Sequence, residues 1–143
     1  TAAIMAIFSI AANAQIFVNN VEVFTKMTKE QVITKFGEPA NYKYYDSQDN
    51  GVDERYFYDG TMLHFNDESF NGFSIKDSRF KVRLEGLDSE VKVGDKFSVL
   101  EPLKPVYMDW FDKNWYCIYY CDEKIRFEVI NGIIQCIVFS ASL

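Results

Sequence analysis

The stretch "ERYFYDGTMLHF", Glu54 to Phe65, carries the pattern that decides the fold, because it reads as a β-hairpin. Two runs rich in aromatic and apolar residues are separated by Asp59 and Gly60, a dipeptide that favours a tight two-residue turn. Pairing across that turn sets Tyr56 opposite Leu63. Alternation then assigns two faces. One holds Tyr56, Tyr58, Leu63 and Phe65, and the other holds Arg55, Phe57, Met62 and His64.

Similar short runs, "NYKYY" and "NGFSI", flank the hairpin and predict further strands. Upstream, "MTKEQVITKFGEP" predicts one short α-helix. Thr28 and Gln31 form a capping box, and Gly37 followed by Pro39 supplies a typical helix end. The first half therefore reads as a short helix followed by an antiparallel meander.

The C-terminal half follows the same order. A shift of 62 residues lays Tyr56 on Ile118 and Leu63 on Ile125. Upstream, "VGDKFSVLEPLKP" predicts a second, weaker helix, with Asp95 as its N-cap and with Pro102 and Pro105 closing it. The sequence thus predicts an α+β fold. It is a tandem repeat of short helix plus antiparallel β-meander, forming one open sheet with helices on one face, with repeats at 15–85 and 86–143.

A helix bearing T-K-E-Q-V and ending in F-G-x-P, followed by a tyrosine-rich hairpin, resembles the unit of the small SmpA/OmlA outer-membrane assembly lipoproteins and of the beta-lactamase inhibitor proteins. Two such units in tandem are more similar to the inhibitor architecture, over about residues 22 to 139. The chain departs from both families. It has no lipidated cysteine after the N-terminal segment, and three cysteines cannot form a disulfide inside each repeat. The resemblance implies the fold more than the function.

The N-terminal segment "TAAIMAIFSIAANAQ" has no charged residue and places Ala12, Asn13 and Ala14 as an A-x-A cleavage site. Residues 1–14 therefore resemble the end of a secretory signal peptide, and the alternative is a buried N-terminal helix. The segment is too short to span a membrane, which takes about 20 apolar residues. We expect a periplasmic or secreted protein without a membrane span.

The composition excludes some partners. The chain has 48% hydrophobic residues, so it can bury a real core, and its formal net charge is −6 without a basic cluster. Nucleic acid is therefore not an expected partner, because binding to phosphates needs a surface excess of Lys and Arg. The three cysteines, Cys117, Cys121 and Cys136, are predicted to be buried thiols. Cys117 and Cys121 share one face of the predicted sheet, and Cys136 lies on the other face.

No motif points to catalysis, a metal or a cofactor. The only histidine, His64, is paired with Arg55 in the predicted hairpin and has no nucleophile beside it. The acidic loop from Asp46 to Glu54 has Gly51 where a calcium loop needs it, but Phe57 stands where the bidentate carboxylate is required. We therefore expect a protein that is not an enzyme.

The surplus of aromatic residues remains to be explained. The predicted register places several of them on the sheet face away from the helices, with others in the loop "VYMDWFDKNW". Aromatic surfaces of this kind supply binding energy at protein interfaces. The alternative is that another layer, a dimer mate or the helices cover them. The candidate binding residues are Phe57, Met62, Tyr107, Trp110, Phe111, Trp115 and Tyr119, and the register adds Ile133 and Ile137 to the same face.

The leading hypothesis is an exported module, not an enzyme, that binds a protein partner through this aromatic face. By resemblance that partner is an envelope protein that the module helps to assemble, or a secreted enzyme that it inhibits. The second hypothesis is a carrier that binds a small apolar ligand in a crevice between the repeats. A closed pocket of roughly a few hundred Å³ favours the carrier, and an open face favours the protein-binding module.

Overall fold

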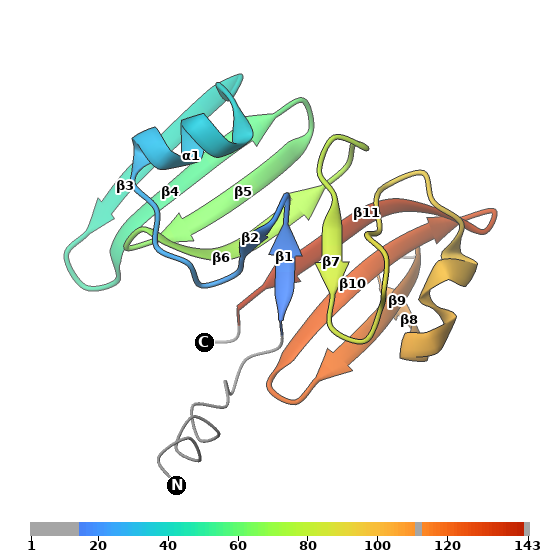
Figure 1. Cartoon of the computed structure of the whole chain (residues 1–143). Coiled ribbons are helices and arrows are strands. Elements are labelled where there is room, and N and C mark those ends of the chain that lie inside the picture. Colours follow the sequence, from blue (N-terminus) through green and yellow to red (C-terminus); the bar gives the residue numbers. More distant parts are fainter. Residues whose placement is uncertain (1–14, 111–112, 142–143) are drawn as a thin grey trace, which may run out of the picture.

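The computed structural model describes residues 15–110 and 113–141 (Figure 1). Most of this chain is strand. The elements in order are β1 (Ile16–Val18), β2 (Val21–Glu22), α1 (Lys29–Phe36), β3 (Asn41–Ser47), β4 (Gly51–Tyr58), β5 (Thr61–Asn66), β6 (Ser69–Ile75), β7 (Val82–Leu84), the 3₁₀ helix η2 (Phe97–Leu103), β8 (Val106–Trp110), β9 (Lys113–Tyr120), β10 (Glu123–Ile130) and β11 (Ile133–Ser140).

Eight strands form one antiparallel sheet in the order β3-β4-β5-β6-β11-β10-β9-β8. β6 and β11, the last strands of the two meanders, pair at its centre, and β3 and β8 are its edges. A second sheet has three strands in the order β2-β1-β7. The structure therefore confirms a fold built mainly of open antiparallel sheets.

The decisive hairpin has the predicted register. Tyr56 pairs with Leu63, and both side chains are buried. The turn residues Asp59 and Gly60 both have positive φ, as a tight hairpin turn requires. The capping box of α1 is also present: the Thr28 hydroxyl accepts a hydrogen bond from the backbone N–H of Gln31, whose side chain accepts one from the Thr28 N–H.

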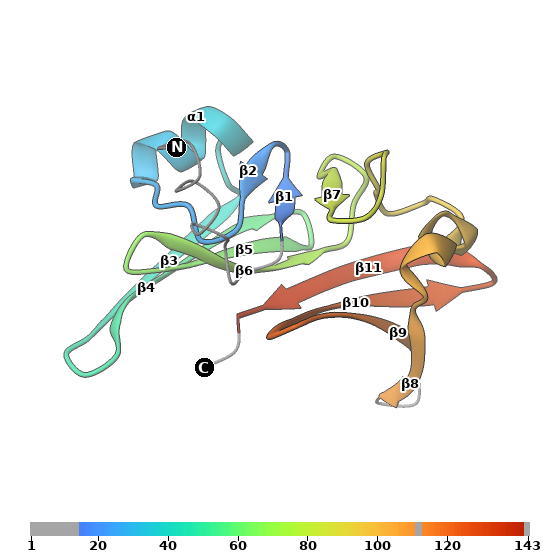
Figure 2. The same ribbon diagram turned by 60° about the horizontal axis from the view of Figure 1, so that its bottom comes forward.

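All other layers lie on one side of the large sheet. In Figure 2, α1, the three-stranded sheet and η2 stand on the same side of β3–β6 and β8–β11. The core lies between these layers, where Val32 of α1 and Ile16 of β1 are fully buried together with the apolar side chains of the sheet. One face of the large sheet is thus covered, and the other face points away from every described layer.

Several local predictions were wrong. The three-stranded sheet was not predicted, because strands of two or three residues leave no periodic pattern. The predicted loop around Tyr107 and Trp110 forms strand β8 instead. The second helix is a 3₁₀ helix, and Lys96 rather than Asp95 occupies its N-cap position. Asp95 instead accepts hydrogen bonds from the backbone and side chain of Lys92.

A β-bulge corrects the predicted faces of β11. The register between β10 and β11 shifts at Glu128 and Val129, so that Ile137 pairs with Phe127 and is buried in the core. Ile137 is therefore not on the face away from the helices. Cys136 pairs with Glu128 and lies on the same face as Cys117, not on the opposite one. A single extra residue reverses the alternation for the rest of a strand.

Candidate protein-binding face

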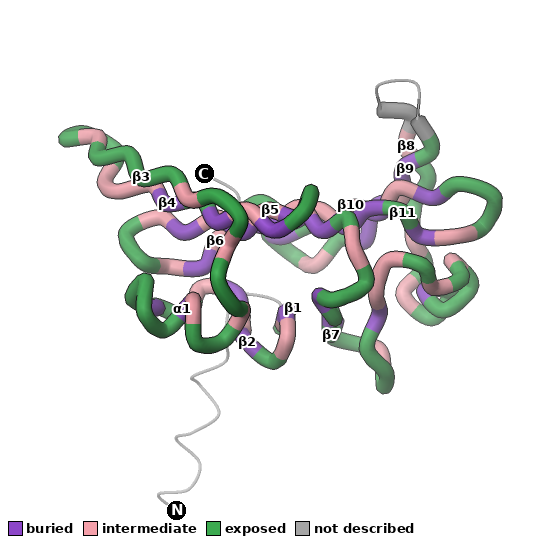
Figure 3. Tube along the Cα trace, turned by 90° about the horizontal axis from the view of Figure 1, so that it is seen from above, coloured by how far each residue is buried: buried purple, intermediate pink, exposed green. Residues whose placement is uncertain are grey.

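The face of the eight-stranded sheet that points away from α1 is called the open face. At its edges, β3 and β8, the backbone of the sheet bends toward this side (Figure 3), and the part of the open face between these two edges is called the trough. Alternation along the paired strands assigns side chains to it. They include Lys43, Tyr45, Asp53, Arg55, Phe57, Met62, His64, Ser74, Val106, Trp115, Cys117, Tyr119, Lys124, Arg126, Glu128, Cys136 and Val138.

One row of cross-strand neighbours traverses the open face. Each member pairs with the next across adjacent strands, and together they connect β4 with β8. In order the row consists of Phe57, Met62, Ser74, Val138, Arg126, Cys117 and Val106. The side chains at the β4 end of this row are apolar. Ser74 and Val138 lie at its centre, and the cationic Arg126 follows on the β10 side. The row therefore spans both meanders.

Apolar and cationic groups are combined at the β3–β5 end. Phe57 and Met62 are direct cross-strand partners and both are half-buried. The ammonium group of Lys43 lies over the Phe57 ring, 5.5 Å from its centroid. This contact keeps an exposed cation next to an aromatic surface, a combination common at protein interfaces.

A polar cluster adjoins this apolar pair. The Asp53 carboxylate accepts a hydrogen bond from Arg55 Nε at 3.2 Å and contacts His64 Nε2 with its other oxygen. These three side chains line a surface cavity of about 520 Å³, together with Tyr45 and other polar residues of β3–β6. Arg55 pairs with His64 as the hairpin predicted, but the histidine contacts Asp53 instead.

The β8–β10 end contains one exposed and one buried aromatic residue. Tyr119 is 60% exposed and lies opposite Lys124. A hydrogen bond with the Cys117 thiol raises the pKa of Tyr119. Trp115 lies on the same face but is only 8% exposed, so it offers little surface to a partner. Cys117 is also buried, so this end of the trough has a small core of its own.

The remaining candidate residues have different positions. Tyr107 pairs with Tyr116, whose ring packs against Phe97 of η2, so Tyr107 lies on the covered side of the sheet. Trp110 ends β8, and its side chain is not described. The prediction for Phe111 falls outside the described residues. Ile133 is half-buried beside the exposed Ile130, at the start of β11 on the open face.

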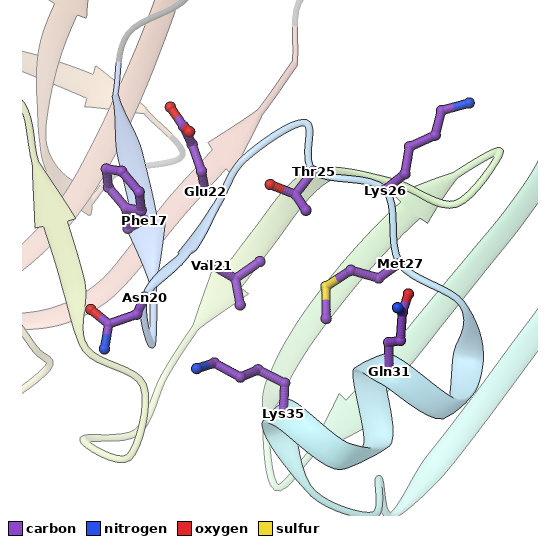
Figure 4. Close-up of a pocket in the computed structure, with 9 residues that line it drawn as sticks. All are labelled: Phe17, Asn20, Val21, Glu22, Thr25, Lys26, Met27, Gln31 and Lys35. Atoms are coloured by element: carbon purple, nitrogen blue, oxygen red, sulfur yellow. The ribbon is translucent and has the colours of Figure 1, made fainter.

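A cavity of about 530 Å³ lies on the opposite side of the sheet, between α1 and the β1–β2 hairpin (Figure 4). Val21 and Met27 form an apolar floor, while Gln31 and Lys35 of α1 stand at its border. All its lining residues come from the segment between Phe17 and Lys35. It is therefore not the crevice between repeats that the carrier hypothesis requires.

Two negative findings concern only residues 15–110 and 113–141. No group of three histidine, cysteine or acidic residues there is arranged to hold a metal ion. In the same part of the chain, no helix has the length and apolar character needed to cross a membrane.

Comparison with known proteins gives no match: no family model, no curated protein and no solved structure is significantly similar to this chain. The geometry of the open face is therefore the basis for the function proposed below.

Proposed function

We propose that the protein is an exported module, not an enzyme, that binds a protein partner through the open face. One observation supports this above all. An entire face of an eight-stranded sheet has no described layer upon it, yet it carries exposed Tyr119 and half-buried Phe57 and Met62. Exposed aromatic surface on an uncovered sheet face favours a binding interface, since aromatic anchors provide most of the energy at such sites.

The trough also has the polar components of an interface. Charged groups border its apolar parts at both ends, as Lys43 borders Phe57 and Lys124 borders Tyr119. An interface usually combines a buried apolar centre with a polar rim. Tyr45, which is 68% exposed, extends this surface along the β3 edge.

The tandem repeat is part of this proposal. The two hairpins correspond at the shift of 62 residues: Tyr56 pairs with Leu63 in the first, and Ile118 pairs with Ile125 in the second. Each hairpin precedes the central strand of its own meander, β6 or β11. If the halves arose by repetition, each contributes an equivalent part of the open face, and the junction of β6 with β11 joins the two parts.

Export remains a proposal that rests on the A-x-A pattern of residues 1–14, which lie outside the described residues. It agrees with the resemblance to envelope and secreted proteins noted above. Cell fractionation with an antibody against the protein tests it: recovery in the periplasmic or secreted fraction supports export, and recovery in the cytosol contradicts it.

Affinity capture from an envelope and secreted-protein extract tests the binding function. The bait is residues 15–143, compared with the double variant Phe57→Ala/Tyr119→Ala, which removes one aromatic anchor from each meander. The matched control is Tyr44→Ala/Tyr107→Ala. It also removes one exposed tyrosine from each meander, but both side chains lie on the covered side.

We expect a prey protein that binds the wild type and the Tyr44/Tyr107 variant but not the Phe57/Tyr119 variant. The melting temperature of the Phe57/Tyr119 variant should stay close to that of the wild type. A prey retained by all three baits contradicts the use of the open face. Absence of any prey also counts against the proposal and redirects attention to a bound small molecule.

A further inference from the structure

We propose that the open face selects an acidic partner: an extended protein segment with two groups of carboxylates that reach the two cationic ends of the trough. This inference rests on the proposed binding function and names the chemistry of the partner. It is carried by the distribution of charge over the sheet and by the spacing of the cations.

The charge on the open face has the opposite sign from that of the whole protein. The chain has a formal net charge of −6. Among the side chains that the structure describes on this face, the cations are Lys43, Arg55, Lys124 and Arg126, and the carboxylates are Asp53 and Glu128. The excess is therefore positive here, and the negative charge is concentrated on the other surfaces. A partner with an acidic surface is repelled elsewhere and attracted to the trough.

The cations are grouped at the two ends. Lys43 and Arg55 are direct cross-strand partners in β3 and β4, and both are exposed. Lys124 and Arg126 lie on one side of β10, two residues apart. β4 and β10 are separated by β5, β6 and β11, so the two groups lie about 19 Å apart at a strand spacing of about 4.8 Å. An extended chain covers that distance in about six residues.

The centre of the trough has no charge to oppose such a segment. Met62, Ser74 and Val138 are successive cross-strand partners between the two cationic groups. They offer apolar contacts and one hydroxyl to the middle of the segment. At the β4 end, Asp53 forms an ion pair with Arg55 and contacts His64, so these charges largely compensate one another and Lys43 supplies the excess positive charge.

The probe is a fluorescein-labelled synthetic peptide in which two glutamate pairs flank four alternating valine and threonine residues. The control peptide replaces every glutamate with glutamine. Fluorescence anisotropy measures the dissociation constants at low and at physiological salt. The acidic peptide is expected to bind at least about tenfold more tightly than the glutamine peptide and to weaken as salt rises, because the contacts are exposed to solvent.

Two variants reverse the charge at one end each: Lys43→Glu/Arg55→Glu and Lys124→Glu. The first is expected to weaken acidic-peptide binding about tenfold and the second severalfold. Lys43→Gln/Arg55→Gln repeats the first test without adding carboxylates beside Asp53, in case the reversed variant does not fold. The control Lys26→Glu/Lys35→Glu makes the same change of charge at the cavity of Figure 4, on the other side of the sheet, and should leave binding unchanged.

Three results would each contradict an acidic partner. The two peptides bind with equal affinity, the acidic peptide does not bind, or the Lys26/Lys35 control loses as much affinity as the open-face variants. The outcome is separable from that of the proposed function. If capture of a prey depends on Phe57 and Tyr119 but survives reversal at Lys43, Arg55 and Lys124, the open face binds a protein and the acidic chemistry is wrong. If capture does not depend on Phe57 and Tyr119, the binding function itself fails.

Discussion

Ser74 of β6 and Cys136 of β11 meet on the open face, with Oγ and Sγ 3.9 Å apart, at the junction where the two meanders join. This contact exists because the β-bulge at Glu128 and Val129 turns Cys136 to the open face. The seam between the meanders therefore contains a buried thiol within the surface that we assign to partner binding. Bulges commonly redirect a side chain in this way.

The first prediction concerns thiol reactivity. The three cysteines form no disulfide; Cys117 and Cys136 are buried, whereas Cys121 is exposed in the turn between β9 and β10. A thiol reagent applied to the folded protein should label one cysteine quickly, and Cys121→Ser should abolish that fast phase. Mass spectrometry after a short maleimide pulse identifies the site. Rapid labelling of Cys136 in the native protein would contradict its burial at the seam.

The two aromatic residues of β9 should respond differently to truncation. Trp115→Ala removes a buried indole and should cost about 3 kcal/mol, which lowers the melting temperature by roughly 10 °C in a domain of this size. Tyr119→Ala, at 60% exposure, should cost less than about 0.5 kcal/mol. Thermal unfolding followed by circular dichroism compares them. Similar losses in both variants would show that the open face is covered at Tyr119.

The alternation of the first hairpin was sufficient to predict Phe57 and Met62 on the face away from the helices. Its turn residues fix the register, and no bulge lies between β4 and β5. The same reasoning misplaced Ile137 and Cys136, because the extra residue in β11 has no marker such as glycine. It also could not separate Trp115 from Tyr119. They share a face, yet Trp115 is 8% and Tyr119 60% exposed, and alternation along one strand cannot encode such a difference.

Glu123 provides a test of stability against pH. Its carboxyl group is buried at the start of β10, and Oε2 has no hydrogen-bond partner among the described residues. Burial, and secondarily the charge of Asp122, raises the pKa of Glu123 above its ordinary value of 4.5. The folded state therefore favours the protonated form, and stability is lost as pH rises from about 4.5 toward the raised pKa.

Glu123→Gln should accordingly stabilise the protein at pH 7, by on the order of 1 kcal/mol, and the difference should vanish well below pH 4.5, where the wild-type carboxyl is protonated in both states. Chemical denaturation at several pH values measures the free energy of unfolding. The control Glu90→Gln changes an exposed carboxylate and should leave the curve unchanged. A Glu123 variant that is less stable at neutral pH would show that the carboxylate has a favourable partner.

The contact between α1 and the sheet can be tested at Tyr58, whose buried hydroxyl donates a hydrogen bond to the carbonyl oxygen of Gly37 at 3.0 Å. Burial raises the pKa of Tyr58 to about 12. Ionisation therefore favours the unfolded state, and stability is lost as pH rises from about 10 to about 12. Tyr58→Phe removes both the hydrogen bond and this titration.

The variant should be about 1 kcal/mol less stable at pH 7, because the Gly37 carbonyl loses its partner, and its stability should fall less steeply between pH 10 and pH 12 than that of the wild type. Tyr45→Phe alters a highly exposed tyrosine and serves as the control, with both properties unchanged. Denaturant titrations across this range give the comparison. If Tyr58→Phe unfolds at high pH as steeply as the wild type, the alkaline loss arises at other tyrosines, and the end of α1 is not anchored to β4 by this hydroxyl.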